Sequence, residues 1–162
     1  MLVYRIERQK YLHEVLSGRG AALSRGNRWN SFNTPMVYTS ATRSLALLEV
    51  MAHIDVFEDL PDDRFILQIE IPEAISIQEL QIDKLPAGWE TFPPGNLTRL
   101  IGDEFIRNRF EAVMKVPSSL IKGEFNYLLN PQHLSMNSVR VVSAEALDLK
   151  RWRKKIPSAA SA

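Results

Sequence analysis

The chain has 162 residues, no cysteine, 45% apolar and 24% charged residues, and a formal net charge of +1. This composition suits one globular domain with one core. The small net charge excludes a strong field that would recruit nucleic acid or a membrane surface. No apolar run is long enough for a signal peptide or a membrane span. Without cysteine, a disulfide framework and thiolate chemistry are excluded, so we expect a soluble protein of the reducing cytoplasm.

The first third of the chain predicts two short strands, a glycine-rich loop and a helix. Residues 2–6 form a β-prone run, and residues 11–16 suit one or two helical turns. Gly18, Gly20 and Gly26 mark a loop. A short strand is expected over 36–39, followed by a helix over 41–56 with Ser40 as its N-cap. Because this helix is apolar nearly all round, we expect it to be largely buried.

The rest of the chain predicts more strands and one further helix. Residues 64–71 alternate as a half-buried strand does, with one face made of Phe65, Leu67, Ile69 and Ile71. A weaker strand is expected over 75–80, a loop over 85–95, and strands over 110–116, 125–129 and 139–142. Asn96 is the expected cap of a helix that ends near residue 108, and its inner face is predicted to hold Leu97, Leu100, Ile101 and Phe105.

This order of elements has no regular strand–helix–strand rhythm. We therefore predict an α+β fold with mixed, largely antiparallel twisted sheets and a few helices. Residues 1–156 are expected to form a single domain. Residues 157–162 are expected to be a disordered tail, and the basic cluster over 150–155 a solvated segment.

Glu49 stands out because it lies in the middle of an apolar helix. Burying a carboxylate costs several kcal/mol unless the group is paired or faces a cleft. His53 lies one helical turn further on, so a structural Glu49–His53 pair is one interpretation. The alternative is that Glu49 faces a cavity, as functional acids often do.

Common catalytic and cofactor motifs are missing from the sequence. There is no P-loop, no Rossmann glycine fingerprint and no G-x-S-x-G elbow. The three histidines, His13, His53 and His133, are too widely separated to predict a metal site. What remains is a set of polar residues placed mostly at element ends, namely Arg28, Tyr38, Glu49, Ser118, Asn126, Asn130 and His133. Each of them alone also fits an ordinary structural role.

Three segments together resemble the RES domain family, which is named for an arginine, a glutamate and a serine. The first runs from Gly26-x-Arg28-Trp29-Asn30 to Pro35-x-x-Tyr38, and the second is Ser44-Leu45-Ala46-x-x-Glu49. The third runs from Val116-Pro117-Ser118 to Asn126-Tyr127-Leu128-x-Asn130-Pro131-x-His133. The turn often has a second glycine in the family where this chain has Asn27. Asparagine tolerates the same left-handed backbone, so this departure is compatible with function.

The resemblance implies a fold similar to ADP-ribosyltransferase toxins and the role of toxin in a RES–Xre toxin–antitoxin pair. It implies that NAD+ is a consumed substrate and that there is no resident cofactor. The expected catalytic residues are Arg28, Glu49 and Ser118, and the expected NAD+-binding residues are Arg28, Tyr38 and Ser118. Asn30, Asn126 and His133 are expected in the surrounding layer. The implied partner is an Xre-type helix-turn-helix antitoxin, and the choice between monomer and homodimer stays open.

The chemistry of these residues suits cleavage of the nicotinamide–ribose bond. An acid such as Glu49 stabilises the oxocarbenium-like ribose or holds its hydroxyls. The Arg28 guanidinium matches phosphate oxygens, Tyr38 is able to stack on nicotinamide, and Ser118 either bonds the ligand or orients another group. Hydrolysis and phosphorolysis of NAD+ are both compatible with this set. Protein mono-ADP-ribosylation at the same site is the alternative, and a catalytically inactive binding module is the third hypothesis.

Overall fold

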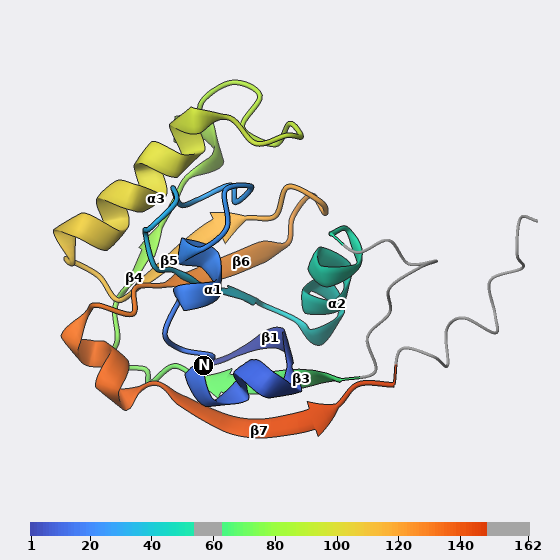
Figure 1. Cartoon of the computed structure of the whole chain (residues 1–162). Helices are drawn as coiled ribbons and strands as arrows, with labels where there is room; N and C mark the ends of the chain where they lie inside the picture. Colours follow the sequence, from blue (N-terminus) through green and yellow to red (C-terminus); the bar gives the residue numbers. More distant parts are fainter. Residues whose placement is uncertain (54–62, 149–162) are drawn as a thin grey trace, which may run out of the picture.

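The computed structural model describes residues 1–53 and 63–148. In this part of the chain seven strands form one sheet in the order β4-β5-β6-β2-β1-β3-β7, and only the β4–β5 pair is parallel (Figure 1). The strands are β1 Leu2–Arg8, β2 Val37–Ser40, β3 Arg64–Glu70, β4 Ile77–Glu79, β5 Val113–Pro117, β6 Phe125–Leu129 and β7 Arg140–Ala146. The expected α+β fold with a largely antiparallel sheet is confirmed.

Three α-helices and three short 3-10 helices accompany the described sheet. The α-helices are α1 Arg19–Ala22, α2 Arg43–Met51 and α3 Asn96–Asn108, and the 3-10 helices are η1 Gln9–Glu14, η2 Ile82–Lys84 and η3 Leu134–Ser138. None of the described helices is both long and apolar enough to cross a membrane. The expected extent of the second helix, over 41–56, is wrong, because α2 begins at Arg43 and ends at Met51 with Ala52 as its C-cap. The basic cluster over 150–155 and the tail over 157–162 lie outside the described residues.

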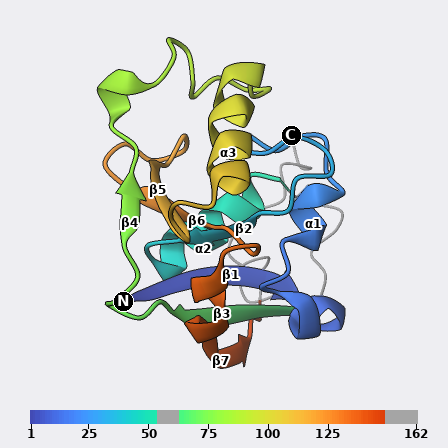
Figure 2. The same cartoon turned by 90° about the vertical axis from the view of Figure 1, so that its left-hand side faces the viewer.

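The two halves of the sheet are joined by little backbone pairing. β1 pairs with β3 along all seven residues, but it pairs with β2 only at Tyr4 and Ser40. β2 instead pairs along its whole length with β6. The sheet therefore consists of a β4-β5-β6-β2 half and a β1-β3-β7 half. Figure 2 shows β4 running across the direction of β1 and β3, so the strand direction changes strongly from one half of the sheet to the other.

The core lies on both faces of the sheet. On β3, Leu67 and Ile69 belong to the largest apolar cluster, whereas Ile66 packs on the other face with Ile6 and Ala46. A sheet covered on both faces selects apolar residues at neighbouring positions, which explains why residues 65–67 are all apolar. The strand expected over 64–71 is confirmed to within one residue. The face prediction was incomplete because Ile66 is buried as well.

The N-cap predicted for the second helix is wrong. The cap of α2 is Thr42, whose side-chain oxygen accepts a hydrogen bond from the Leu45 amide at 3.1 Å. Ser40 is still part of β2, where it pairs with Tyr4. The expected burial is also wrong, because the buried side chains of α2 are Leu45 and Ala46 and Leu48 is 38% exposed. The helix packs on the face of the sheet that carries Ile6 and Ile66, so only one stripe of its own surface is buried.

The face predicted for the third helix is also wrong in part. Leu97 and Leu100 are each 59% exposed, and the cap is Gly95 instead of Asn96. The buried positions are Thr98, Gly102, Phe105 and Ile106. A Cβ added to Gly102 would lie 1.7 Å from the carbonyl oxygen of Trp29. Backbone therefore packs on backbone at this glycine, and this close approach fixes the rotation of the helix.

The remaining differences concern the lengths of elements. β5 begins at Val113, so the expected start at Phe110 is wrong, and that side chain is 82% exposed. β4 is shorter than expected, β7 is longer, and α1 occupies part of the segment expected to be loop. The strand over 125–129 is confirmed with the expected bounds.

Candidate active site

A cavity of about 700 Å³ opens where the two half-sheets meet. Its walls come from β1, β2, α2, the start of β6, the turn over 26–29 and the segment that leads into α3. Figure 1 shows these elements on one side of the molecule, with α2 below and the segment before α3 above. The polar side chains in its wall include Arg5, Arg28, Tyr38, Glu49, Arg64 and Asn126.

Glu49 lines this cavity and is held by two neutral donors. Its Oε1 accepts a hydrogen bond from Asn126 Nδ2 at 2.6 Å and from Ser118 Oγ at 3.3 Å. Asn126 is itself held through its Oδ1, which accepts from Ser40 Oγ at 2.7 Å. Both bonds go to Oε1, so Oε2 has no hydrogen-bond partner among the described residues. Of the two interpretations of Glu49, the geometry favours the cavity and shows no described ion pair with His53.

Ser118 lies behind Glu49, outside the described lining of the cavity. It is buried at the end of β5, and its Oγ accepts hydrogen bonds from the Leu120 and Ile121 amides at 3.1 and 3.2 Å. Those bonds fix the hydroxyl so that it donates to Glu49. Of the two roles expected for Ser118, this arrangement favours orienting another site group over direct contact with a ligand.

Tyr38 connects β2 to the turn that carries Arg28. Its hydroxyl accepts a hydrogen bond from the Trp29 amide at 3.1 Å and donates to Asn30 Oδ1 at 2.7 Å. Asn30 is completely buried and donates to the carbonyl oxygens of Ala21, Ser31 and Thr34. Burial raises the pKa of Tyr38 above its ordinary value, so the hydroxyl is neutral at physiological pH. The ring is thus a wall of the cavity, and the hydroxyl fixes the turn.

Arg28 is bound to the backbone of the segment that leads into α3. Its Nη1 donates to the carbonyl oxygens of Trp89 and Thr91, and its Nη2 donates to that of Glu90 at 3.3 Å. These bonds use three of its five N–H groups. Among the described residues, the Nε–H and one Nη2–H of Arg28 have no hydrogen-bond partner, so both are available to a ligand. Burial lowers the pKa of Arg28, with Glu49 opposing that shift, and the guanidinium stays charged at neutral pH.

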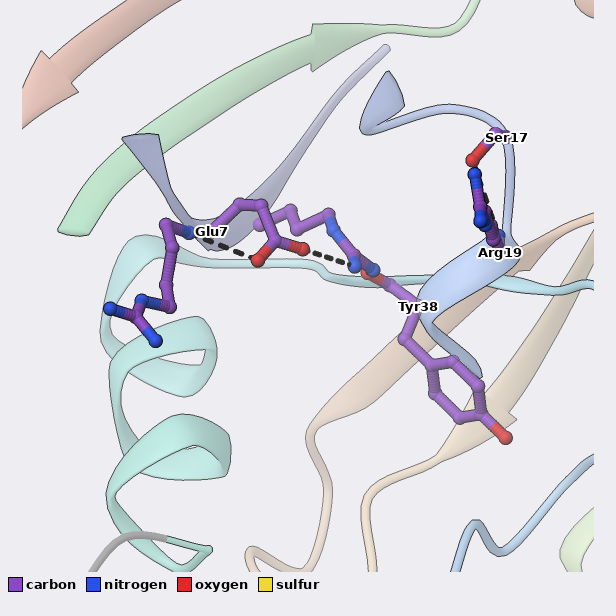
Figure 3. Close-up of polar contacts among 6 residues, drawn as sticks. Glu7, Ser17, Arg19 and Tyr38 are labelled. Atoms are coloured by element: carbon purple, nitrogen blue, oxygen red, sulfur yellow. Dashed lines mark hydrogen bonds and ion pairs between the residues drawn. The ribbon is translucent and has the colours of Figure 1, made fainter. Parts of the chain in front are cut away.

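Arg5 also lines the cavity, and the sequence reasoning missed it. Its Nη1 donates to the Tyr38 carbonyl at 3.0 Å across the β1–β2 joint, and its Nη2 donates to Glu7 Oε2 at 2.7 Å. Figure 3 shows the Tyr38 backbone beside this contact and the ring extending away from Glu7. The Nε of Arg5 is buried without a hydrogen-bond partner in the described chain. The sequence offered one signal for this arginine. Arg5 lies two residues after the buried Val3, so both side chains are on the same face of the strand.

A third arginine, Arg64 at the start of β3, lines the same cavity and was missed as well. Burial lowers its pKa, and the charge of Glu7 opposes that shift. Its Nε is also buried and has no hydrogen-bond partner among the described residues. Three guanidinium groups therefore surround a space whose described acidic lining consists of Glu49 and Glu90. Such a distribution suits an anionic ligand that also presents one cationic part.

His133 lies away from this cavity. Its Nδ1 accepts a hydrogen bond from the Ser135 amide and caps η3, and the described lining of the cavity does not include it. Nearby Asn130 is completely buried and donates to the carbonyl oxygens of Phe105 and Ile106 near the end of α3. The third family segment thus contributes Ser118 and Asn126 to the surroundings of Glu49, whereas its Asn130 bonds the end of α3 and its His133 caps η3.

The split sheet encloses one cavity with an acid from α2, arginines and a tyrosine, and the sequence that builds this site matches a known family. The family model of the RES domain matches residues 2–151, and the chain belongs to the RES domain family. A protein named Toxin Res from Photorhabdus laumondii is 38% identical over 144 residues, which cover 86% of this chain and 90% of that protein.

A second relative and a solved structure are also similar to this chain. A protein named Prs ADP-ribosylating toxin, from Sphingobium sp., is 31% identical over 144 residues, which cover 88% of this chain and 85% of that protein. A chain in the crystal structure of the M. tuberculosis MbcT–MbcA toxin–antitoxin complex superposes with a TM-score of 0.74. That match covers 94% of this chain and 87% of the other at 14% identity, so it shows a shared fold.

Proposed function

We propose that this protein is the toxin of a toxin–antitoxin pair and that it consumes NAD+ by cleaving the nicotinamide–ribose bond. The observation that carries the proposal is the Glu49 carboxylate, which faces the cavity with Oε2 free of described partners while Asn126 and Ser118 hold Oε1. A fixed anion of this kind stabilises the positive charge that develops on the ribose during bond cleavage.

The cations of the cavity are assigned to the pyrophosphate of NAD+. Arg28 keeps two N–H groups for a ligand, and Arg5 and Arg64 complete a positively charged wall. Guanidinium groups match phosphate oxygens in shape and charge. Tyr38 presents its ring to the cavity as a stacking surface for nicotinamide. Asn126, Ser118 and Asn30 act as positioning residues through Glu49 and Tyr38.

The reaction needs no acid to protonate the leaving group. The nicotinamide ring nitrogen of NAD+ is positively charged, and it takes the electron pair of the broken C–N bond and leaves as a neutral molecule. The ribose carbon then accepts water, which gives ADP-ribose and a proton, or phosphate, which gives the ribose phosphate ester. This is consistent with a site built around an acid and arginines.

Protein mono-ADP-ribosylation is the second candidate function. It is favoured by the name of the Sphingobium relative, an ADP-ribosylating toxin. The same cavity would serve, with a protein side chain as the acceptor in place of water or phosphate. NAD+ labelled in its adenylate half distinguishes the two, because transfer fixes the label to a protein band and hydrolysis or phosphorolysis leaves it in a small molecule.

The direct test incubates the purified protein with NAD+, with and without phosphate, and identifies the products by chromatography. We expect nicotinamide to be released by the wild type and its rate to fall about 100- to 1,000-fold in Glu49→Gln. Glu73→Gln is the matched control, because it makes the same change at an exposed carboxylate outside the cavity. Unchanged NAD+ with antitoxin-free, folded wild type refutes the proposal.

The proposed partner is an Xre-type helix-turn-helix antitoxin. The structural match to a chain of a toxin–antitoxin complex supports an antitoxin partner, and the family resemblance implies the Xre type. We expect wild-type protein to arrest growth when expressed alone and a small helix-turn-helix protein encoded next to it to restore growth and to copurify. Glu49→Gln should bind that protein without arresting growth. Growth arrest by a folded Glu49→Gln variant would show that the site assignment is wrong.

A further inference from the structure

Phe92 is a large apolar side chain left in solvent at the wall of the cavity. It is 80% exposed and lines the cavity together with Glu90 and Pro94 of the same segment. Phe110 is equally exposed, at 82%, but it is not part of that lining. An exposed aromatic ring at the rim of a polar cavity offers a flat face on which a planar ligand group can stack.

The backbone on both sides of Phe92 is fixed. Arg28 donates to the carbonyl oxygens of the three residues before it, Trp89 to Thr91. After it, Arg99 donates to the Pro94 carbonyl at 3.2 Å and to the Asn27 carbonyl at 2.8 Å. The rings of Trp89 and Trp29 also lie against each other, with centroids 6.3 Å apart. Two arginines therefore fasten this segment to the turn over 27–29, and the ring of Phe92 projects from a rigid rim.

Arg28 connects Glu49 with Phe92: the charge of Glu49 acts on its guanidinium, and its backbone bonds reach the segment that carries Phe92. Glu49 on α2 marks the position of the reacting ribose. Arg28 keeps two N–H groups for phosphate oxygens, and its other bonds end at Thr91, the residue directly before Phe92. A ligand with its ribose at Glu49 and its pyrophosphate at Arg28 therefore extends its second nucleoside toward Phe92.

We propose that Phe92 is the stacking surface for the adenine ring of NAD+ and that Arg28, besides binding phosphate, positions that surface through the carbonyl oxygens it holds. This assignment rests on the proposed function. Stacking on an aromatic face is tolerant of base identity because every base has a π-face. Phe92 therefore contributes to the affinity for the adenylate half of the substrate and leaves the chemistry at the ribose unchanged.

The test compares Phe92→Ala, Phe92→Trp and Phe110→Ala in steady-state cleavage of NAD+, with melting temperatures as a check on folding. Inhibition by AMP and by nicotinamide mononucleotide reports the two halves of the site separately. We expect Phe92→Ala to raise KM for NAD+ and Ki for AMP about tenfold. The values of kcat and of Ki for nicotinamide mononucleotide should stay within about twofold. Phe92→Trp should restore KM, and Phe110→Ala should behave as wild type.

Two results overturn the assignment while leaving the proposed function intact. One is a wild-type KM in folded Phe92→Ala. The other is an equal rise of the inhibition constants for AMP and for nicotinamide mononucleotide, which would show that Phe92 makes no specific contact with adenine. A wild-type protein that does not cleave NAD+ at all refutes the proposed function itself, and the Phe92 assignment falls with it. The wild-type assay therefore separates the two failures.

Discussion

Replacing Asn126 with alanine tests whether the neutral donors around Glu49 serve catalysis. The change removes the 2.6 Å hydrogen bond to Glu49 Oε1 and leaves the longer 3.3 Å bond from Ser118. A hydrogen bond to a charged group contributes roughly 1.5–3 kcal/mol. If that contribution is fully present in the transition state, the rate falls about 10- to 150-fold. The loss should appear in kcat, because Asn126 holds the acid, whereas in the proposed site the arginines bind the pyrophosphate.

The assay is the release of nicotinamide from saturating NAD+, measured beside the melting temperature of each variant. Ser40→Ala is the graded comparison, since it removes only the outer 2.7 Å bond to Asn126 Oδ1. We expect its kcat to lie between those of wild type and Asn126→Ala. A kcat within about twofold of wild type in folded Asn126→Ala would refute the argument that this amide positions the carboxylate.

Three further variants test the packing and the surroundings of the cavity. Gly102→Ala should lower the free energy of unfolding, measured by denaturant titration, by at least about 3 kcal/mol. The reason is that the new Cβ would lie 1.7 Å from the Trp29 carbonyl oxygen. A loss below about 1 kcal/mol would contradict this packing. Tyr38→Phe should cost roughly 1–3 kcal/mol of stability by stranding buried hydrogen-bonding groups. Since burial raises the pKa of Tyr38, the hydroxyl's contribution is complete below its ordinary pKa of about 10 and is lost as pH rises above it. The stability gap between wild type and Tyr38→Phe should therefore narrow in alkaline denaturant titrations, and a widening gap would contradict the burial argument. Arg28→Lys should raise KM for NAD+ about tenfold, because one ammonium group cannot replace a guanidinium that bonds three carbonyl oxygens. A wild-type KM would show that the guanidinium is dispensable.

The strands could be predicted from the sequence because their signals are local. The alternation over 64–71 predicted β3 to within one residue, and the β-prone residues over 125–129 predicted β6 with its bounds. The faces of the helices could not be predicted in the same way. The rotation of α3 depends on Gly102 meeting the Trp29 backbone, which is a contact between segments far apart in the sequence. Periodicity shows that a helix has an apolar face, but a close backbone contact decides which residues turn inward.

The same limit applies to the site. Local reasoning singled out Glu49 as an acid in an apolar helix but could not assign its partners, which lie 69 and 77 residues further along the chain. The family resemblance linked Ser118 and Asn126, two polar residues at element ends, to the same site as Glu49, and the fold places both at Oε1. It did not bring in Arg5, because a single arginine in a short strand looks like an ordinary surface cation. The weak β1–β2 joint that lets Arg5 reach the Tyr38 carbonyl is a property of the tertiary structure.

The way in which the site separates its charges explains how it could stabilise a cationic ribose beside an anionic pyrophosphate. A cation bonded directly to Glu49 would stabilise the carboxylate but would also weaken its attraction for positive charge on the ribose. The described contacts avoid this, because an amide and a hydroxyl hold Glu49 while Arg28 bonds carbonyl oxygens and Arg5 pairs with Glu7. Neutral dipoles fix the position of the acid and leave its full charge for the transition state. This argument also favours the neutral network over a Glu49–His53 pair as the arrangement suited to catalysis, since a protonated histidine would neutralise the acid at the moment when its charge is required.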